Sequence, residues 1–355
     1  MLNDLKVMVS AVGAPGCSTL IRKIRENGER KVTIIGIDAD EEVFGNFYSD
    51  IFYQVPTVND EASYRQSILS IIQKEKPDVF YPVSSAEVPI ISHMISEIES
   101  LGTKVCVSSN EAILFAENKY ELYKTLEENG VPVPKFYYPK NLEEFNKYAK
   151  ELGYPEKQIC FKPHHSKGSR GFRIIDDSIS RKDLLLNYKP EARYMSMREF
   201  NEIFENEESF PDLLLMEVAQ GTEYDVMSLC DNGEPLVTTV KTREKSRWGI
   251  ITLGELIENE EIKNYAQKTV SLAGLSFNVG VQFIGNKVIE INARPSTFIY
   301  HETINEPYLA IKYKLGEITK EELQKVEANI KSGVRMIRYM DQIFYEDVKD
   351  REYYN

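Results

Sequence analysis

The first hundred or so residues alternate short apolar runs with longer segments whose apolar residues recur at helical spacing. The apolar runs cover residues 6–12, 32–37, 51–55, 79–83 and 104–107, and the helical segments cover 18–27, 61–74 and 87–101. Strands buried on both faces read as near-continuous apolar runs, and their alternation with helices is typical of a parallel sheet. We therefore predict a doubly wound α/β domain over residues 1–111.

The pattern changes after residue 111 to a mixture of helices and antiparallel strands. A helix over 112–129 should end at Gly130, because Pro132 and Pro134 prevent its continuation. Strands are predicted at 159–163, from 172, and at 213–218, with hairpins at 224–230/236–242 and 280–284/288–292 and a helix at 260–273. We predict an α+β remainder made of a small lid subdomain, 112–190, and a large subdomain with a C-terminal extension, 191–355.

Charge and cysteine content narrow the function classes. The formal net charge is -13, whereas nucleic-acid binding needs a basic face, so we expect no nucleic-acid partner. The cysteines are widely separated and form no CxxC pair, which is typical of a reduced cytoplasmic protein. No signal-like N-terminus and no membrane-length apolar run is evident, so we expect a cytoplasmic protein without membrane contact.

The turn Gly13-Ala14-Pro15-Gly16 follows the first predicted strand and precedes a helix that Ser18 or Thr19 could cap. Backbone N–H groups at such a helix start favour an anion. Asp38 ends the second strand, where a dinucleotide-binding enzyme would hold a ribose. The loop lacks the full GxGxxG spacing, so a turn that only packs helix on strand explains it equally well.

The segment Val288-Ile289-Glu290-Ile291-Asn292-Ala293-Arg294 carries the strongest chemical signal. Alternation along a strand places Glu290, Asn292 and Arg294 on one face. Carboxylate and amide oxygens suit Mg²⁺, and a guanidinium could neutralise a phosphoryl group. Gln282 could add an oxygen if the connection Gly285-Asn286-Lys287 has three residues, as we predict; a two-residue turn would place it on the opposite face. A surface strand with alternating polar residues is the alternative.

A basic, glycine-rich segment follows a buried strand at residues 162–172. Lys162 ends that strand, so its ammonium must find an anion or reach solvent. Gly168 and Gly171 would let the backbone bend around phosphate oxygens, although an exposed hairpin loop has the same composition. His164 and His165 point in opposite directions on an extended chain, and we assign them to a surface loop.

A third segment runs from Leu215 to Glu223. A strand that leaves its sheet at Glu217-Val218 would expose a carbonyl and an N–H group to the edge of an adenine, and Glu223 could hold ribose hydroxyls. Glu217 is explained equally well as a member of a salt bridge. Each of the three segments has a structural explanation when it is taken alone.

In this order, the segments resemble the ATP-grasp superfamily over nearly the whole chain. The resemblance is greatest to the half-repeat of the carbamoyl phosphate synthase large subunit and its stand-alone relatives, the carboxylate–amine ligase type. The family pattern KPxxGSGSRGV corresponds to residues 162–172, where Ser166 replaces a glycine and Lys167 a serine. The family's glutamate followed by glycine–x–glutamate corresponds to Glu217, Gly221 and Glu223. Its terminal pattern NxQF…EINPR corresponds to Asn278, 282–283 and 290–294, with Ala293 replacing proline.

The resemblance implies nucleotide-binding roles along the chain. Lys119 would contact the α-phosphate of ATP, and Lys162 the α- and β-phosphates and adenine. Gly168 and Ser169 would belong to a mobile lid over the β- and γ-phosphates. Adenine and ribose would be bound by the backbone of Glu217 and Val218 and by the side chain of Glu223.

The resemblance also implies a metal and substrate site. Glu290 would bridge one or two Mg²⁺ ions, for which Mn²⁺ could substitute, with Gln282 and Asn292 as further ligands. Arg294 would stabilise an acyl phosphate. Substrate carboxylate or γ-phosphate would be bound by Lys241 and Arg243.

Together these features predict an ATP- and Mg²⁺-dependent ligase that activates a small carboxylate as an acyl phosphate for attack by an amine or similar nucleophile. The chain holds one such unit and no glutaminase segment, so we do not expect complete carbamoyl phosphate synthase activity. The alternatives are a nucleotide-binding module without ligase chemistry and, more distantly, a nicotinamide-dependent oxidoreductase. The partners would be small molecules, and a homodimer is the family-level expectation.

Overall fold

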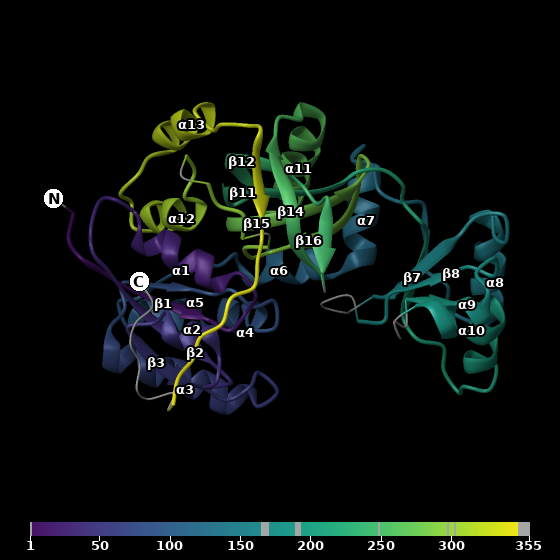
Figure 1. Ribbon diagram of the computed structural model, residues 1–355, viewed down its shortest axis with the longest axis horizontal. Helices are drawn as coiled ribbons and strands as arrows, with labels where there is room; N and C mark the ends of the chain where they lie inside the picture. Colours follow the sequence, from purple (N-terminus) through teal and green to yellow (C-terminus); the bar gives the residue numbers. More distant parts are fainter. Residues whose placement is uncertain are drawn as a thin grey trace. The chain divides into compact units, whose positions relative to one another are not determined.

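The computed structural model describes residues 2–164, 170–188, 193–247, 249–296, 298–301 and 303–346 (Figure 1). The chain divides into two compact units. Unit 1 comprises Met1–Ala116, Glu223–Gln282 and Ile291–Asn355, and unit 2 comprises Glu117–Thr222 and Phe283–Glu290. Within the described ranges, none of the helices combines the length and the apolarity of a membrane-spanning segment.

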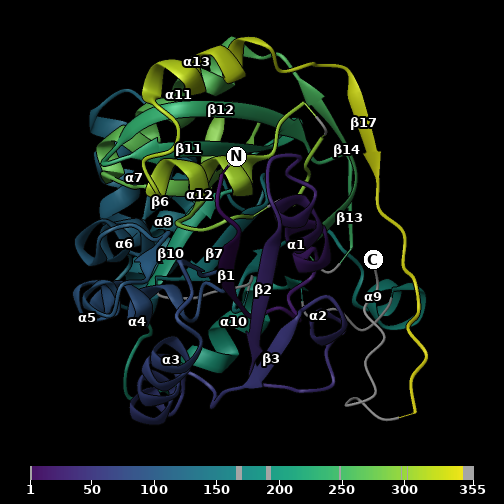
Figure 2. The same cartoon turned by 90° about the vertical axis from the view of Figure 1, so that its left-hand side faces the viewer.

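Unit 1 begins with the predicted doubly wound domain. Its strands pair in the order β3-β2-β1-β4-β5, and each of these pairings is parallel, as Figure 2 shows for β1, β2 and β3. The strands are β1 (Leu5–Ser10), β2 (Val32–Asp38), β3 (Ile51–Gln54), β4 (Val79–Tyr81) and β5 (Lys104–Val105), and the helices between them are α1 (Cys17–Arg25), α2 (Phe44–Phe47), α3 (Glu61–Glu75), α4 (Val88–His93) and α5 (Ile95–Ser100).

The two faces of this sheet bury different side chains of the same strand. Val7 and Val9 of β1 belong to the core cluster that contains α1, whereas Met8 belongs to the cluster that contains α3 and α4. Because parallel strands end at a common edge, the loops after β1, β2 and β4 meet there. This edge carries Ser10, Asp38 and the loop after β4.

The helix predicted over 112–129 is two helices, α6 (Asn110–Glu117) and α7 (Lys119–Glu128). The prediction missed the break because the apolar period continues through it. Asn118 separates the helices by capping the second one: its side chain accepts a hydrogen bond from the Glu121 N–H at 3.0 Å. Lys119 is therefore the first residue of α7, where its position is set by the cap.

A second sheet, most of whose strands belong to unit 1, has the strand order β13-β14-β12-β11-β15-β16, with β17 paired to β14 (Figure 2). Asn232 and Gly233 join β11 to β12 with φ values of 47° and 83°, the left-handed pair that a tight hairpin requires. The strands are β11 (Glu223–Asp231), β12 (Glu234–Thr242), β13 (Lys245–Arg247), β14 (Ile250–Ile257), β15 (Phe277–Ile284), β16 (Lys287–Asn292) and β17 (Val334–Ile337), with helices α11 (Glu260–Ala273), α12 (Glu306–Lys314) and α13 (Lys320–Ala328).

The connection between β15 and β16 differs from the prediction. It has two residues, Gly285 and Asn286, and not three. Gly285 has φ 60°, which permits a tight turn, and a Cβ there would lie 2.8 Å from the Gln220 carbonyl oxygen. In a regular two-residue hairpin, Gln282 lies on the face opposite Glu290. The connection thus lacks the three residues on which the predicted Gln282 ligand depended, and the metal role of Gln282 stays a prediction.

Unit 2 is built on a sheet with the order β6-β10-β7-β8-β9 and the helices α7–α10 (Figure 1). Stacked phenylalanines form its core: the Phe145 and Phe200 ring centroids lie 4.0 Å apart, and those of Phe161 and Phe200 lie 5.0 Å apart. Its elements are β6 (Phe136–Tyr137), α8 (Leu142–Glu151), β7 (Ile159–Pro163), β8 (Arg173–Ile175), α9 (Arg181–Asn187), β9 (Tyr194–Met195), α10 (Met197–Phe204) and β10 (Leu213–Glu217).

The predicted boundary at residue 191 is wrong. The strand β10 pairs with both β6 and β7, so residues up to 222 complete the sheet of unit 2. Residues 1–111 are not a separate core either, because the cluster around α1 includes Leu229 and Leu236 of the second sheet. Sequence order alone could not show which distant strands share a sheet.

Candidate functional site

The turn after β1 is fixed by contacts within unit 1. The Gly13 N–H donates to the Asp38 carboxylate at 2.8 Å, so Asp38 closes the turn. The residue that caps α1 is Gly16, in the left-handed conformation and without a side-chain cap, so the predicted capping by Ser18 or Thr19 is wrong. These contacts favour the packing explanation of this turn over a dinucleotide site.

Lys162 of β7 is a partly buried cation in unit 2. Its ammonium donates to the Ile289 carbonyl at 2.9 Å and to the Tyr123 hydroxyl at 3.2 Å. Burial lowers the pKa of Lys162, and the negative charge of Glu290 opposes this shift. Among the described residues, the ammonium's hydrogen-bond partners are thus two neutral oxygens, with a carboxylate nearby. The structure brings the predicted phosphate ligand Lys162 and the predicted metal ligand Glu290 together.

Tyr123 was missed by the sequence analysis. Its hydroxyl donates to the Ile289 carbonyl at 2.7 Å, and the Lys162 ammonium lies 5.0 Å from its ring centroid. A spacing signal existed, because Lys119 and Tyr123 are four residues apart and so share one face of α7. Lys119 donates to the His164 carbonyl at 3.2 Å, which places it beside the segment after β7.

Glu217 forms a salt bridge, which the sequence allowed as the alternative to an adenine-binding role. Its carboxylate forms an ion pair with Lys287 and accepts a hydrogen bond from the Lys135 N–H at 2.9 Å. Partial burial raises the pKa of Glu217, but these two donors outweigh it and lower the pKa overall. The adenine-binding role of the Glu217 and Val218 backbone remains a prediction. Gly168 and Ser169 lie outside the described residues.

The strand β16 carries Glu290 and Asn292, both partly exposed and separated by the buried Ile291. Two residues on, the Arg294 guanidinium donates to the Ser85 hydroxyl in the loop after β4, which ties it to the edge of the parallel sheet. Within the described ranges, no group of three or more His, Cys, Asp or Glu side chains could hold a metal ion. One carboxylate and one amide instead fit Mg²⁺, which takes further oxygens from phosphates and water.

Four charged side chains lie on one face of the β11–β12 hairpin in unit 1. Asp225 is paired with Lys241 across the ladder, and the Arg243 N–H donates to the Glu223 carbonyl at 2.9 Å. The Arg243 guanidinium lies 3.3 Å from the Glu223 carboxylate and 3.6 Å from that of Asp225. Asp225 was missed, although it is two residues from Glu223 and therefore shares its face.

Asp225 also links this face to the segment after Arg294. It is fully buried and accepts a hydrogen bond from the Ser296 hydroxyl at 3.0 Å. Burial raises the pKa of Asp225, and Arg243 and Lys241 oppose that shift. Gly280 makes room for this contact, because a Cβ there would lie 2.0 Å from the Ser296 hydroxyl.

The predicted substrate role of Lys241 is not supported. Its ammonium contacts both carboxylate oxygens of Glu306 at 3.0 Å, and the two side chains are 0% and 2% exposed. The Thr239 hydroxyl donates to the same carboxylate at 2.6 Å. An ammonium so enclosed and neutralised cannot also hold a substrate anion, so we correct Lys241 to a structural ion pair.

We expect Glu306→Ala to lower the free energy of unfolding by about 3–5 kcal/mol, because it leaves the Lys241 ammonium buried without its partner. Chemical denaturation would measure the change. The double variant Lys241→Met/Glu306→Leu removes both charges and should recover most of the stability. If the double variant were as unstable as Glu306→Ala, the cost would come from lost packing and not from the unpaired charge.

Glu87 lies at the same edge of the parallel sheet and has a raised pKa. Its carboxylate accepts the Ser10 hydroxyl at 2.6 Å, and that hydroxyl accepts the Val83 N–H at 3.1 Å. Burial is the main cause that raises the pKa of Glu87 to about 7, with Asp38 adding to it. This carboxyl group therefore titrates near neutral pH.

The free energy of unfolding should fall as the pH rises from 4.5 to about 7. Over this range the folded state still binds a proton at Glu87 that the unfolded state has released. At about 1.4 kcal/mol per pKa unit, the loss is on the order of 3 kcal/mol. We expect Glu87→Gln, which keeps an acceptor for Ser10, to match the wild type at pH 5 and to be more stable at pH 8. Thermal unfolding across this range tests it; equal stability at both pH values would contradict it.

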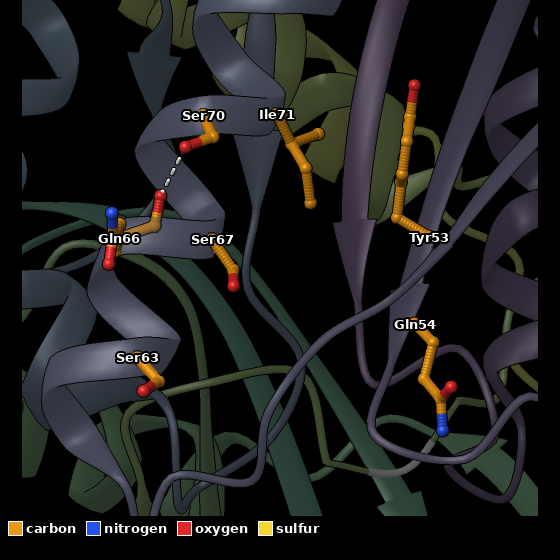
Figure 3. Close-up of a pocket in the computed structure, with 7 residues that line it drawn as sticks. All are labelled: Tyr53, Gln54, Ser63, Gln66, Ser67, Ser70 and Ile71. Atoms are coloured by element: carbon orange, nitrogen blue, oxygen red, sulfur yellow. Dashed lines mark hydrogen bonds between the residues drawn. The ribbon is translucent and has the colours of Figure 1, made fainter.

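A hollow of 340 Å³ opens between β3 and α3 (Figure 3). Its walls combine the apolar side chain of Ile71 with hydroxyl and amide side chains and hold no charged group; the polar residues are Tyr53, Gln54, Ser63, Gln66, Ser67 and Ser70. None of the predicted site residues lines it, so this hollow is not the predicted phosphate or metal site.

The doubly wound sheet and the two sheets that follow it are the architecture of the ATP-grasp fold. A solved structure with this architecture is the biotin carboxylase domain of Hydrogenobacter thermophilus 2-oxoglutarate carboxylase, in complex with MgADP, ADP and bicarbonate. It is similar to this chain with a TM-score of 0.62 and 19% identity, over 93% of this chain and 73% of that one.

The sequence supports the same assignment. Residues 209–338 match the family described as ATP-grasp in the biosynthetic pathway with Ter operon. The carbamoyl phosphate synthase large chain of Thermotoga neapolitana is 29% identical over 113 residues, which is 31% of this chain and 10% of that protein. The formate-dependent phosphoribosylglycinamide formyltransferase of Sulfurisphaera tokodaii is 33% identical over 110 residues, 31% of this chain and 26% of that protein. The chain is thus related in sequence to ATP-grasp proteins, although these matches cover only a small part of the relatives.

Proposed function

We propose that this chain is an ADP-forming ligase that uses ATP and Mg²⁺ to activate a small carboxylate as an acyl phosphate for attack by an amine or similar nucleophile. The observation that carries the proposal is that the Lys162 ammonium contacts β16 next to Glu290, the proposed metal ligand. Lys162 is held at the Ile289 carbonyl, one residue before Glu290, which supports a joint role of the two residues in holding phosphate and Mg²⁺. A site for a nucleotide–magnesium complex requires both.

Each residue has a distinct part in this proposal. Glu290 and Asn292 would hold Mg²⁺, which neutralises phosphate oxygens when bound. Lys162 would bind phosphate oxygens, for which its buried ammonium is already desolvated and oriented. Arg294, held by Ser85, would stabilise the negative charge on the transferred phosphoryl group, and Arg243 would bind substrate or γ-phosphate.

The proposed chemistry has two balanced steps. First, a carboxylate oxygen forms a bond to the γ-phosphorus of ATP, the bond from that phosphorus to the bridging oxygen breaks, and ADP leaves with the electron pair. Second, the lone pair of the amine forms a bond to the acyl carbon, and inorganic phosphate leaves with the acyl–oxygen electron pair while the nitrogen loses a proton. The related proteins include one solved with MgADP, which supports the nucleotide part.

The test is ADP and phosphate release from Mg·ATP across a panel of amino acids and small carboxylates, each paired with ammonia or an amine. The expected result is release that depends on one carboxylate and stops when EDTA removes the metal ion. ATP binding by calorimetry without release for any carboxylate would instead favour the alternative, a nucleotide-binding module that serves as a sensor or as a partner of another enzyme.

A further inference from the structure

Tyr300, in the segment after Arg294, has a hydroxyl that the protein leaves without a partner. The residue is only partly buried, but its hydroxyl oxygen is covered and, among the described residues, makes no hydrogen bond. Its ring packs edge-on against Phe298, with centroids 6.5 Å apart and planes at 82°. A buried hydroxyl without a partner is costly to a folded protein, and a bound ligand can supply the missing acceptor.

The groups around this hydroxyl favour an anionic ligand. Burial and the charge of Glu306 raise the pKa of Tyr300 well above its ordinary value, whereas Arg338 and Arg294 act in the opposite direction. The Lys241 ammonium is 6.0 Å from the ring centroid, but Glu306 neutralises it. The Arg338 guanidinium donates to the carbonyl of Phe298, two residues before Tyr300, so a cation is fixed beside this segment, and the protonated hydroxyl can donate.

Backbone contacts fix the position of Phe298, against which the Tyr300 ring packs. Phe298 has φ 51°, in the left-handed region that a non-glycine residue seldom adopts. The Arg338 guanidinium, at the end of β17, donates to the Phe298 carbonyl at 3.3 Å and to the Ile251 carbonyl of β14 at 3.1 Å. A Cβ at Gly16 would lie 2.7 Å from the Phe298 side chain, so the N-terminus of α1 packs closely against that side chain. Strands β14 and β17 run side by side in Figure 2.

We propose that the Tyr300 hydroxyl donates a hydrogen bond to the anionic group of the substrate, seated between Arg294 and Arg338. That group is the carboxylate before activation and the acyl phosphate after it. The ligand displaces the side chains that cover the oxygen, and it exchanges an unpaired hydroxyl for a hydrogen bond to a charged acceptor, which is the stronger kind. This inference rests on the proposed ligase function, of which it names a substrate-binding residue.

The test is Tyr300→Phe, which removes only the oxygen. The KM of the carboxylate identified by the ADP-release panel should rise about 10- to 100-fold, the range for a lost hydrogen bond to a charged group. The KM of ATP should not change, since ATP binds before the acyl phosphate forms, when the hydroxyl contacts only the carboxylate. The unfolding temperature should not fall, because no bond within the protein is lost.

Tyr81→Phe is the matched control. The Tyr81 hydroxyl is buried in the same unit but is hydrogen-bonded to Asn278. We therefore expect this variant to unfold at a lower temperature with both KM values unchanged. An unchanged carboxylate KM in Tyr300→Phe would overturn the inference while leaving the ligase function intact, as would a rise in the ATP KM alone.

If the wild type releases no ADP with any carboxylate, the ligase function fails, and the anion seat is then tested separately. Inorganic phosphate is the probe, because it shares the oxygen acceptors of both ligand forms. Calorimetry should show phosphate binding to the wild type and weaker binding to Tyr300→Phe. Equal binding by the two proteins, or none by the wild type, would overturn the inference.

Discussion

Glu290→Ala should reduce the kcat for ADP release by about 10³-fold or more, because the proposed magnesium site has one carboxylate on β16 and the amide of Asn292 cannot replace its charge. The side chain is partly exposed, and its neighbour Ile291 carries the packing of the strand. The variant should therefore fold normally. Steady-state ADP release at saturating Mg·ATP measures the effect, and circular dichroism checks the fold.

The control for this variant is Glu234→Ala, an exposed glutamate at the start of β12 whose partner is the surface residue Lys320. It removes the same charge outside the proposed site and should leave turnover unchanged. Glu290→Gln keeps the size and one oxygen but not the charge, so it should be nearly as inactive as the alanine variant. Full turnover in Glu290→Ala would refute the assignment of the metal strand.

Lys162→Ala should also reduce turnover, by about 10²–10³-fold, because a preoriented cation acts most strongly on charge in a water-excluded site. We expect little loss of stability. The Tyr123 hydroxyl keeps its own hydrogen bond to the Ile289 carbonyl at 2.7 Å, so that carbonyl remains paired. Burial, which lowers the pKa of Lys162, also means that removing the charge relieves a desolvation cost.

Two measurements separate a nucleotide-binding role of Lys162 from a structural one. ATP affinity by calorimetry should weaken in Lys162→Ala, while the unfolding temperature without nucleotide should stay the same or rise. Lys124→Ala, an exposed lysine of α7 in the same unit, is the control and should change neither. A large drop in unfolding temperature together with unchanged ATP affinity would show that Lys162 stabilises the fold and does not bind the nucleotide.

Local sequence patterns were sufficient to predict those structural features whose physical cause is also local. Near-continuous apolar runs predicted the parallel strands because both faces of such a sheet are buried. Asn232-Gly233 predicted the β11–β12 hairpin because few other residues accept two left-handed conformations in succession. The same locality explains why the helix break at Asn118 was missed: one capping side chain ended a pattern whose apolar period continued.

Pairing of side chains across the fold could not be predicted in this way. Lys241 looked like a substrate ligand because a lysine near the end of a strand carries no mark of its partner, and only α12 supplies Glu306. Asp225 looked ordinary until β12 placed Lys241 opposite it. The contact that decides the role of Lys241 joins residues far apart in the chain, and burial determines whether its charge faces a ligand or a neighbour.

The sequence by itself determined the doubly wound domain and the alternation that puts Glu290 and Asn292 on one face of β16, because each depends on residue type and short-range spacing. The tertiary structure alone decided that Tyr123 and Ile289 hold Lys162, that Lys241 pairs with Glu306, and that the Tyr300 hydroxyl has no hydrogen-bond partner among the described residues. These features arise when distant segments pack and water is excluded, which fixes how each buried polar group is paired.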